Sequence, residues 1–361
     1  MRTAPFCLLT ALIFIPVDAT AAQPIKGMIE VKLDGRWVEG QPLNWNASRV
    51  YLLGRDGRLW QFAHHEATDF RKTADRFRPE TTSRLRANLL RELGDGFQVT
   101  GTNHYMIAHR RGEGKQWSPR FEQLYRSFVH YFSVRGFKLK KPAFPMLAIV
   151  YRDRDEFNHR SALDGATAVG NIAGYYRPIS NRIALYDMRE QGGQAVKSWQ
   201  STSSVIIHEA THQIAFNTGI HNRFTHPPLW VVEGLATMFE APGVHDSRNH
   251  PNRRQRINKD RLADFRKLAL ADNRAEILGD IVASDRIFSA DSRAAYAEAW
   301  ALTFYLAETQ PSKYAKYLAK TAARPPFTEY TESQRLADFT AVFGDNWPML
   351  NSRMLSFLAE L

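Results

Sequence analysis

The early part of the chain contains two pairs of stretches with the alternation of apolar and polar residues that is typical of strands. In each pair, a tight-turn signal connects the first stretch to the second. Residues 28–33 lead through Asp34-Gly35 into residues 36–40, and residues 50–53 lead through Asp56-Gly57 into residues 59–62. Asp-Gly favours two-residue hairpin turns, in which both central residues adopt positive φ. We therefore predict two β-hairpins, and from them a small β-barrel-like module of four or five strands over residues 23–72.

The remainder of the chain changes from strand-like to helical patterns. Charged sequence over residues 69–93 favours a helix, so we interpret residues 73–96 as a helical linker. Apolar spacing predicts a helix over residues 117–137, and nearly everything after residue 201 has a helical pattern. Strands are predicted at five places: residues 97–100, 105–108, 144–151, 174–176 and 182–186. Strands first and helices later favour an α+β fold, in which residues 97–361 form one domain with a mixed sheet and a helical C-terminal half.

The N-terminus has the order of a secretory signal peptide. A positive start at Met1-Arg2 is followed by an apolar run over residues 5–17 and by small residues at 19–22. We predict a signal peptide over residues 1–22 and a secreted or periplasmic protein. No apolar run reaches the roughly 20 residues that span a bilayer, so no transmembrane segment is expected. The single cysteine, Cys7, lies in this signal, so any metal must be held by histidines and carboxylates.

The formal net charge of +11 favours anionic partners, and the positive residues are spread along the chain. The densest short run, residues 253–256, is small. A nucleic-acid partner has only this charge in its favour, so none is expected. An anionic envelope polymer stays open as a partner.

The sequence H-E-x-x-H at residues 208–212 is the first pattern that points to specific chemistry. On a helix, His208 and His212 are four residues apart and project from one face, as two zinc ligands must. Glu209 follows the first of them, so its carboxylate can act as a general base on water without binding the metal. A Ser/Thr cluster at residues 201–204 is expected to cap the start of this helix, and Gly219 to end it.

A second helix, predicted to start after Pro227-Pro228, supplies the third ligand. Catalytic zinc commonly takes two histidines and one glutamate, and Glu233 lies on this helix. Glu240 follows seven positions later on nearly the same face, where it could orient a ligand imidazole or could serve as an ordinary surface or capping residue. His221 and His226, in the loop between the two motif helices, are candidates to line the cleft.

Together these motifs resemble the gluzincin metallopeptidases, in particular the aminopeptidase N-like group with H-E-x-x-H and W-x-x-E-G-x-A. Twenty residues separate His212 from Glu233, and the matching residues of the second motif are Trp230, Glu233, Gly234, Ala236 and Glu240. The resemblance implies one zinc ion held by His208, His212 and Glu233, with Glu209 as general base. It also implies that Tyr296, in the helical segment 296–306, stabilises the oxyanion.

Two departures limit what the resemblance implies. The G-x-M-E-N segment that binds a substrate's free amine in the aminopeptidases is absent, although residues 174–176 stand where a substrate-aligning edge strand is expected. We therefore expect an endopeptidase or a peptide-trimming enzyme that acts on peptide or protein substrates. The metzincin pattern fails, because Ala215 and Thr218 occupy the positions of its glycine and third histidine.

Two functions follow from the sequence. The first is zinc-dependent hydrolysis of peptide bonds in an extracytoplasmic compartment, on a fold with a β-barrel-like module and a gluzincin-type domain. The alternative is a non-enzymatic envelope-binding protein, in which the N-terminal module and the basic charge bind an envelope polymer and the metal site is structural.

Overall fold

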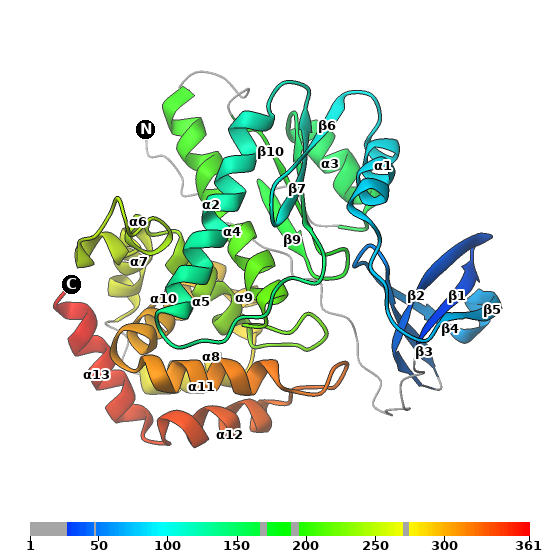
Figure 1. The fold of residues 1–361 in the computed structure, drawn as a ribbon. Helices are drawn as coiled ribbons and strands as arrows, with labels where there is room; N and C mark the ends of the chain where they lie inside the picture. The colour runs from blue at the N-terminus through cyan, green and yellow to red at the C-terminus, as the bar shows by residue number, and fades with distance from the viewer. Residues whose placement is uncertain (1–26, 47, 167–171, 189–194, 270–273) are drawn as a thin grey trace.

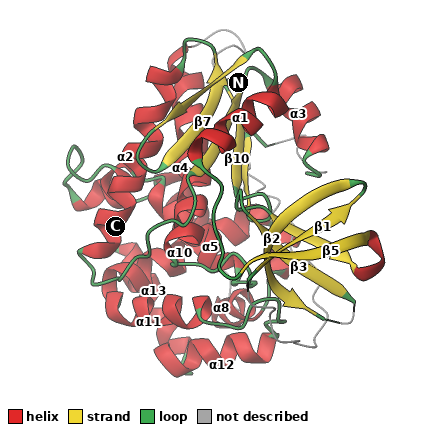
Figure 2. Ribbon diagram, turned by 45° about the vertical axis from the view of Figure 1, so that its right-hand side comes forward, coloured by secondary structure: helices red, strands yellow, loops and turns green. Residues whose placement is uncertain are grey.

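A computed structural model describes residues 27–46, 48–166, 172–188, 195–269 and 274–361. The fold is α+β: two β-sheets occupy the N-terminal part, and the C-terminal half is helical (Figures 1 and 2). The predicted signal peptide, residues 1–22, lies outside the described residues.

The first sheet is the N-terminal module, with strand order β4-β3-β2-β1-β5. Its strands are β1 (Met28–Leu33), β2 (Arg36–Trp45), β3 (Arg49–Gly54), β4 (Leu59–Ala63) and β5 (Ala67–Ala74), and a 3-10 turn, η1 (His64–Glu66), precedes β5. Both predicted hairpins are confirmed, and Asp34 and Gly35 have the positive φ values of 47° and 75° that the first turn requires. The small core of the module comprises Ile29, Val31, Val38, Val50, Leu52 and Phe62.

The module is not a closed barrel. In the described pairing β4 bonds only β3 and β5 bonds only β1, so the sheet stays open and the barrel prediction is not confirmed. Strand β5 also corrects the predicted helix, because residues 69–74 are strand and α1 spans only Thr82–Leu93. Most side chains of β5 are exposed, so backbone pairing with β1 forms this strand and leaves no apolar alternation to detect.

The second sheet has the order β6-β7-β8-β10-β9 and is mixed, as predicted. Its strands are β6 (Phe97–Gly101), β7 (Tyr105–Arg110), β8 (Met146–Tyr151), β9 (Gly174–Arg177) and β10 (Arg182–Tyr186). The pairs β7–β8 and β8–β10 are parallel, and β9 is an antiparallel edge strand. Helices α2 (Gly114–Ser133) and α3 (Arg154–Leu163) pack against it.

The helical half shares one hydrophobic core with this sheet, and Trp117, Trp230 and Trp300 are among its fully buried side chains. Its elements are α4 (Ala195–Thr218), α5 (Leu229–Phe239), α6 (Pro242–His245), η3 (Arg253–Arg256), α7 (Lys259–Leu268), α8 (Arg274–Ala283), α9 (Arg286–Ala290), α10 (Ser292–Thr309), α11 (Pro311–Ala322), α12 (Glu332–Phe343) and α13 (Trp347–Ala359). Within the described ranges, no helix combines the length and the apolar character that crossing a membrane requires.

Helix α4 ends where the sequence predicts but starts earlier. Gly219 follows its last residue with a φ of 85°, a conformation that suits glycine. The helix already includes Ala195, so the Ser/Thr cluster at residues 201–204 lies inside it and is not its cap. The hydroxyl of Thr202 instead accepts a hydrogen bond from the backbone N–H of Met188, in the segment after β10 (3.3 Å). Thr202, which the local sequence predicts to cap the helix, thus makes a tertiary hydrogen bond instead.

The N-terminal module docks close to the two motif helices. Tyr51 stacks on Phe327 with 4.1 Å between the ring centroids. The half-buried side chain of Arg223, in the loop between α4 and α5, donates to the carbonyl oxygens of Gly57 (2.8 Å) and Pro178 (2.7 Å). Both contacts connect the module to segments that surround the H-E-x-x-H helix.

Candidate metal centre

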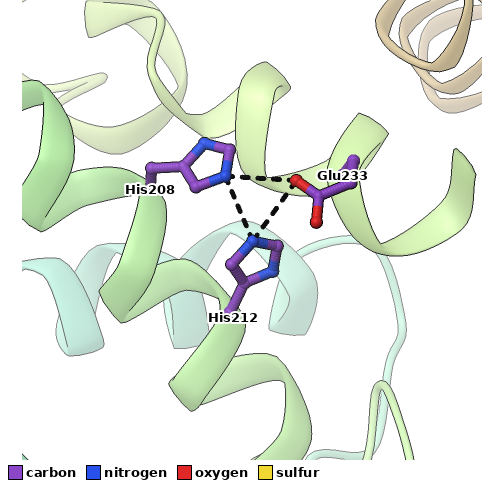
Figure 3. Close-up of side chains that lie close together, drawn as sticks. All are labelled: His208, His212 and Glu233. Carbon is purple, nitrogen blue, oxygen red and sulfur yellow. Dashed lines mark hydrogen bonds and ion pairs between the residues drawn. The ribbon is translucent and has the colours of Figure 1, made fainter. Parts of the chain in front are cut away.

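Helices α4 and α5 bring three side chains to one point (Figure 3). His208 Nε2 lies 3.1 Å from His212 Nε2 and 3.2 Å from Glu233 Oε2, and His212 Nε2 lies 3.5 Å from the same carboxylate oxygen. Three atoms that each bind a tetrahedral zinc ion at about 2.0–2.1 Å are about 3.3 Å apart. The observed spacings therefore fit one small cation at the centre of the triangle.

The donor set also fits a cation chemically. His208 Nδ1 contacts Glu240 Oε1 at 2.8 Å, so its Nε2 can present a lone pair to the other two ligand atoms. His208, His212 and Glu233 are each at most 1% exposed, and Glu233 Oε1 has no hydrogen-bond partner among the described residues. Buried polar atoms that converge this closely beside a carboxylate favour a positive charge between them. These three residues form the only such group in the described part of the chain.

The acid–base properties of the ligands show the same preference for positive charge. Burial alone would lower the pKa of His208, but its hydrogen bonds to Glu233 and Glu240 raise it to about 10. Burial opposes the ionisation of Glu233, yet the charge of His212 and the hydrogen bonds from both imidazoles hold its pKa well below the usual range. The two carboxylates thus favour positive charge on the His208 side chain.

Glu240 orients His208 from behind. Its Oε1 contacts His208 Nδ1, and its Oε2 accepts a hydrogen bond from Asn258 Nδ2 at 2.9 Å. Asn258 also donates to the carbonyl oxygen of Thr237 at 3.0 Å, which anchors it to α5. Of the roles left open for Glu240, the structure shows the contact with an imidazole, that of the candidate ligand His208. Asn258 was missed by the sequence analysis, because its only local signal is that of an N-cap for α7.

Glu209 lies beside this group and is held by the edge strand. The backbone N–H of Tyr176, in β9, donates to Glu209 Oε2 at 2.7 Å. Glu209 Oε1 is buried and has no hydrogen-bond partner among the described residues. Burial is the main reason why the pKa of Glu209 is raised. One oxygen is therefore fixed, and the other can bind a proton.

Tyr296 reaches the centre because α10 packs closely on α5. Its ring centroid lies 6.3 Å from that of His208, and the guanidinium of Arg261 lies 5.1 Å above its ring. A Cβ atom at Gly234 would lie 2.2 Å from Thr303 Oγ1 and 2.4 Å from the carbonyl oxygen of Ala299, both in α10. The glycine of the E-G pair thus permits the close approach that places Tyr296 next to His208.

The two histidines of the loop between α4 and α5, His221 and His226, differ in burial and in surroundings. His221 is 1% exposed, its ring packs on Phe216 at a centroid distance of 5.2 Å, and neither ring nitrogen has a hydrogen-bond partner among the described residues. His226 is half-buried, and burial followed by the charge of Arg335 lowers its pKa, while Asp285 raises it. His221 thus contacts the helix that carries the H-E-x-x-H motif.

Residues 202–328 match the model of a family described as "Protein of unknown function (DUF1570)". The match covers about a third of the chain, and it includes every residue assigned above to the metal centre together with Glu209, Glu240 and Tyr296. No curated protein matches the chain. The family description assigns no activity.

Proposed function

We propose that the protein is a zinc-dependent peptidase of an extracytoplasmic compartment, with His208, His212 and Glu233 as metal ligands and Glu209 as general base. The observation that carries this proposal is the triangle of ligand atoms, 3.1–3.5 Å on each side, next to a carboxylate that has one oxygen fixed and one unpartnered. The resemblance to the gluzincin motifs and the predicted signal peptide support the reaction class and the compartment.

Each residue has a distinct task in hydrolysis. A zinc ion, when bound, supplies Lewis acidity toward water and toward a peptide carbonyl. Glu209 uses its unpartnered oxygen to accept a proton from the attacking water and to pass it to the leaving amine. The N–H of Tyr176 prevents that carboxylate from rotating away. Tyr296 donates a hydrogen bond to the carbonyl oxygen as its negative charge grows.

Zinc analysis combined with a cleavage assay tests the proposal. We expect one zinc ion per chain and hydrolysis of a fluorogenic peptide library that stops on addition of 1,10-phenanthroline. The Glu209→Gln variant should keep its zinc and lose about 10²- to 10⁴-fold in kcat, because general base catalysis contributes that much. Glu276→Gln, at an exposed position of α8, is the matched control and should be unaffected. Undiminished cleavage by the Glu209→Gln variant, or in the presence of the chelator, refutes the peptidase.

A non-enzymatic envelope-binding protein is the second candidate, and one surface favours it. Trp37 of the N-terminal module is 50% exposed, and the guanidinium of Arg71, on the same face of the sheet, lies 5.4 Å above its ring. Against this candidate, structural zinc sites have four protein ligands, whereas three converge among the described residues. Sedimentation with peptidoglycan separates the two functions: binding that Trp37→Ala and Arg71→Ala abolish in the full chain, without hydrolysis, supports the second.

A further inference from the structure

The turn between β9 and β10, residues 178–181, continues the strand that fixes Glu209. Tyr176, whose backbone N–H donates to Glu209 Oε2 at 2.7 Å, lies two residues before this turn. Strand β9 has only four residues, and β10 is its only strand neighbour in the described sheet. With so little strand pairing, β9 depends on the contacts of the turn for its position.

Helix α4 holds the end of the turn. Asn181 has a φ of 57°, and its carbonyl oxygen accepts a hydrogen bond from Gln213 Nε2 at 2.8 Å. Its side chain exchanges two hydrogen bonds with that of Asn217, at 2.8 and 2.9 Å. The Oδ1 atom of Asn181 also accepts a hydrogen bond from the hydroxyl of Tyr176 at 2.9 Å. One end of the turn is thus connected both to the helix that carries Glu209 and to Tyr176 itself.

The N-terminal module and Arg223 hold the start of the turn. The backbone N–H of Leu59, in β4, donates to the carbonyl oxygen of Ile179 at 2.8 Å. Arg223 donates to the carbonyl oxygen of Pro178 through Nε (3.0 Å) and Nη2 (2.7 Å). Its Nη2 also donates to the carbonyl oxygen of Gly57 at 2.8 Å. One guanidinium therefore joins the loop between the ligand helices, the β9–β10 turn and the module.

A small apolar cluster surrounds this junction. Its members come from the module, the turn, the loop between α4 and α5, and the segment before α12; they include Tyr51, Leu59, Ile179, Phe224 and Phe327. The backbone N–H of Phe327 donates to the carbonyl oxygen of Phe224 at 2.7 Å, next to Arg223 in the chain. Hydrogen bonds beside apolar side chains are stronger than hydrogen bonds in water, so the junction resists displacement of the turn.

We propose that Arg223 is a positioning residue of the peptidase, which binds the β9–β10 turn to the N-terminal module and so keeps β9 where Tyr176 N–H reaches Glu209. This proposal rests on the proposed function. It gives the module a task in the enzyme itself, because the module then supports the strand that orients the general base. A displacement of about 1 Å in such a group can lower a rate about 100-fold.

The amide signal of Tyr176 tests the proposal without a turnover assay. In the full chain labelled with ¹⁵N-tyrosine, Tyr176→Phe identifies the signal, and Glu209→Ala gives its position without the carboxylate. Arg223→Met keeps most of the side-chain length but removes the donors, so it should move the signal toward the Glu209→Ala position. Arg223→Lys, which restores a charged donor, should return most of the shift.

Arg160→Met is the matched control. Arg160 is also half-buried and also donates to two carbonyl oxygens, those of Glu92 (3.2 Å) and Leu93 (3.0 Å), but it connects α3 to α1. Its replacement should leave the Tyr176 signal unmoved. An equal shift in Arg160→Met would mean a general loss of stability and overturns the proposal.

Tyr51→Leu tests the module and remains informative if Arg223→Met does not fold. It removes the stack on Phe327 but keeps an apolar side chain, so the Tyr176 signal should move in the same direction by a smaller amount. An unmoved signal in either Arg223→Met or Tyr51→Leu overturns the proposal.

Zinc affinity and hydrolysis separate this proposal from the proposed function. Calorimetry should give a zinc affinity for Arg223→Met within about 3-fold of the wild type, because the ligands lie on α4 and α5; a fall above about 10-fold would mean that Arg223 holds the ligand helices, and overturns the proposal. Where peptides are cleaved, kcat/KM should fall about 10- to 100-fold in Arg223→Met. A wild type that cleaves no peptide refutes the peptidase, and the Tyr176 signal then still decides whether Arg223 positions β9.

Discussion

Glu122 and Glu233 are both buried carboxylates in contact with histidine, but only Glu122 has a hydrogen-bond or ion-pair partner for each of its oxygens. Glu122 Oε2 accepts hydrogen bonds from Thr102 Oγ1 (2.7 Å) and from the backbone N–H of His104 (3.2 Å). Glu122 Oε1 contacts His104 Nδ1 at 2.8 Å, and the guanidinium of Arg126 lies 3.5 Å away. Every acceptor of this group has a donor in the chain, so the cluster stabilises the β6–β7 hairpin against α2 and leaves no position for a ligand.

The surroundings of Glu233 are incomplete. Its Oε2 lies close to two imidazole nitrogens, which also lie close to each other. Its Oε1 has no hydrogen-bond partner among the described residues, and the same holds for Glu209 Oε1 and for both ring nitrogens of His221. Burying unpaired acceptors costs stability, so a protein retains them where a ligand supplies the missing interactions. Between these two clusters, the difference lies in the hydrogen bonding of the carboxylate and not in the presence of histidine and glutamate.

Replacing the carboxylate of each cluster in turn should produce the largest difference in zinc affinity. Glu233→Ala should lower zinc affinity by at least about 100-fold, because even residues that only orient a ligand contribute about 10- to 100-fold. Glu122→Gln should bind zinc as the wild type does. Competition titration with a chromophoric chelator measures both affinities. Equal zinc affinities for the wild type and Glu233→Ala would mean that Glu233 is not a metal ligand.

Adding zinc should stabilise one cluster only. At a free zinc concentration about 100 times the dissociation constant, the free energy of unfolding should rise by about 2.7 kcal/mol, because the metal binds the folded chain. Glu122→Gln should keep this increment in full, and Glu233→Ala should lose it. Urea denaturation with and without a chelator measures the difference. An increment that survives in Glu233→Ala would place the metal elsewhere.

Removing the residue behind His208 should have a smaller effect. Glu240→Gln leaves the three ligands in place but weakens the contact that orients the imidazole, so zinc affinity should fall about 10- to 100-fold. Asn258→Ala removes the hydrogen bond to Glu240 Oε2 and should have a weaker effect of the same sign. Both affinities are read by the same titration, and a Glu240→Gln variant with wild-type affinity would make Glu240 a capping residue only.

The smallest expected effect concerns the completed cluster and depends on pH. Burial opposes the ionisation of Glu122, but hydrogen bonds from Thr102 and His104 outweigh it and lower its pKa. A lowered folded pKa contributes stability above the unfolded value of about 4.3, and this contribution is lost as pH falls through the folded pKa. Glu122→Gln should therefore cost about 1–2 kcal/mol at pH 7 and progressively less below about pH 4. Denaturation at several pH values tests this, and a cost that does not depend on pH would mean that ionised Glu122 contributes nothing.

The local sequence predicted the elements that carry the chemistry. Four-residue spacing placed His208 and His212 on one helix face, and the Pro-Pro start and the W-x-x-E-G pattern placed Glu233 on the next helix. The strands of the second sheet were found within about two residues, because β7, β8 and β10 are apolar over most of their length and β6 alternates apolar with polar side chains. Periodicity reports which side chains face a core, and these elements all face one.

The tertiary structure decided the features that no local pattern encodes. Strand β5 forms by pairing its backbone with β1, the cluster at residues 201–204 lies within a helix, and the β-module does not close. The sequence by itself determined which residues could hold a metal. Only the fold determined that Asn258 supports Glu240, that a backbone N–H of β9 holds Glu209, and that His221 is buried without a partner. The physical reason is that backbone donors and long-range neighbours carry no signature in residue order, whereas helix-face spacing does.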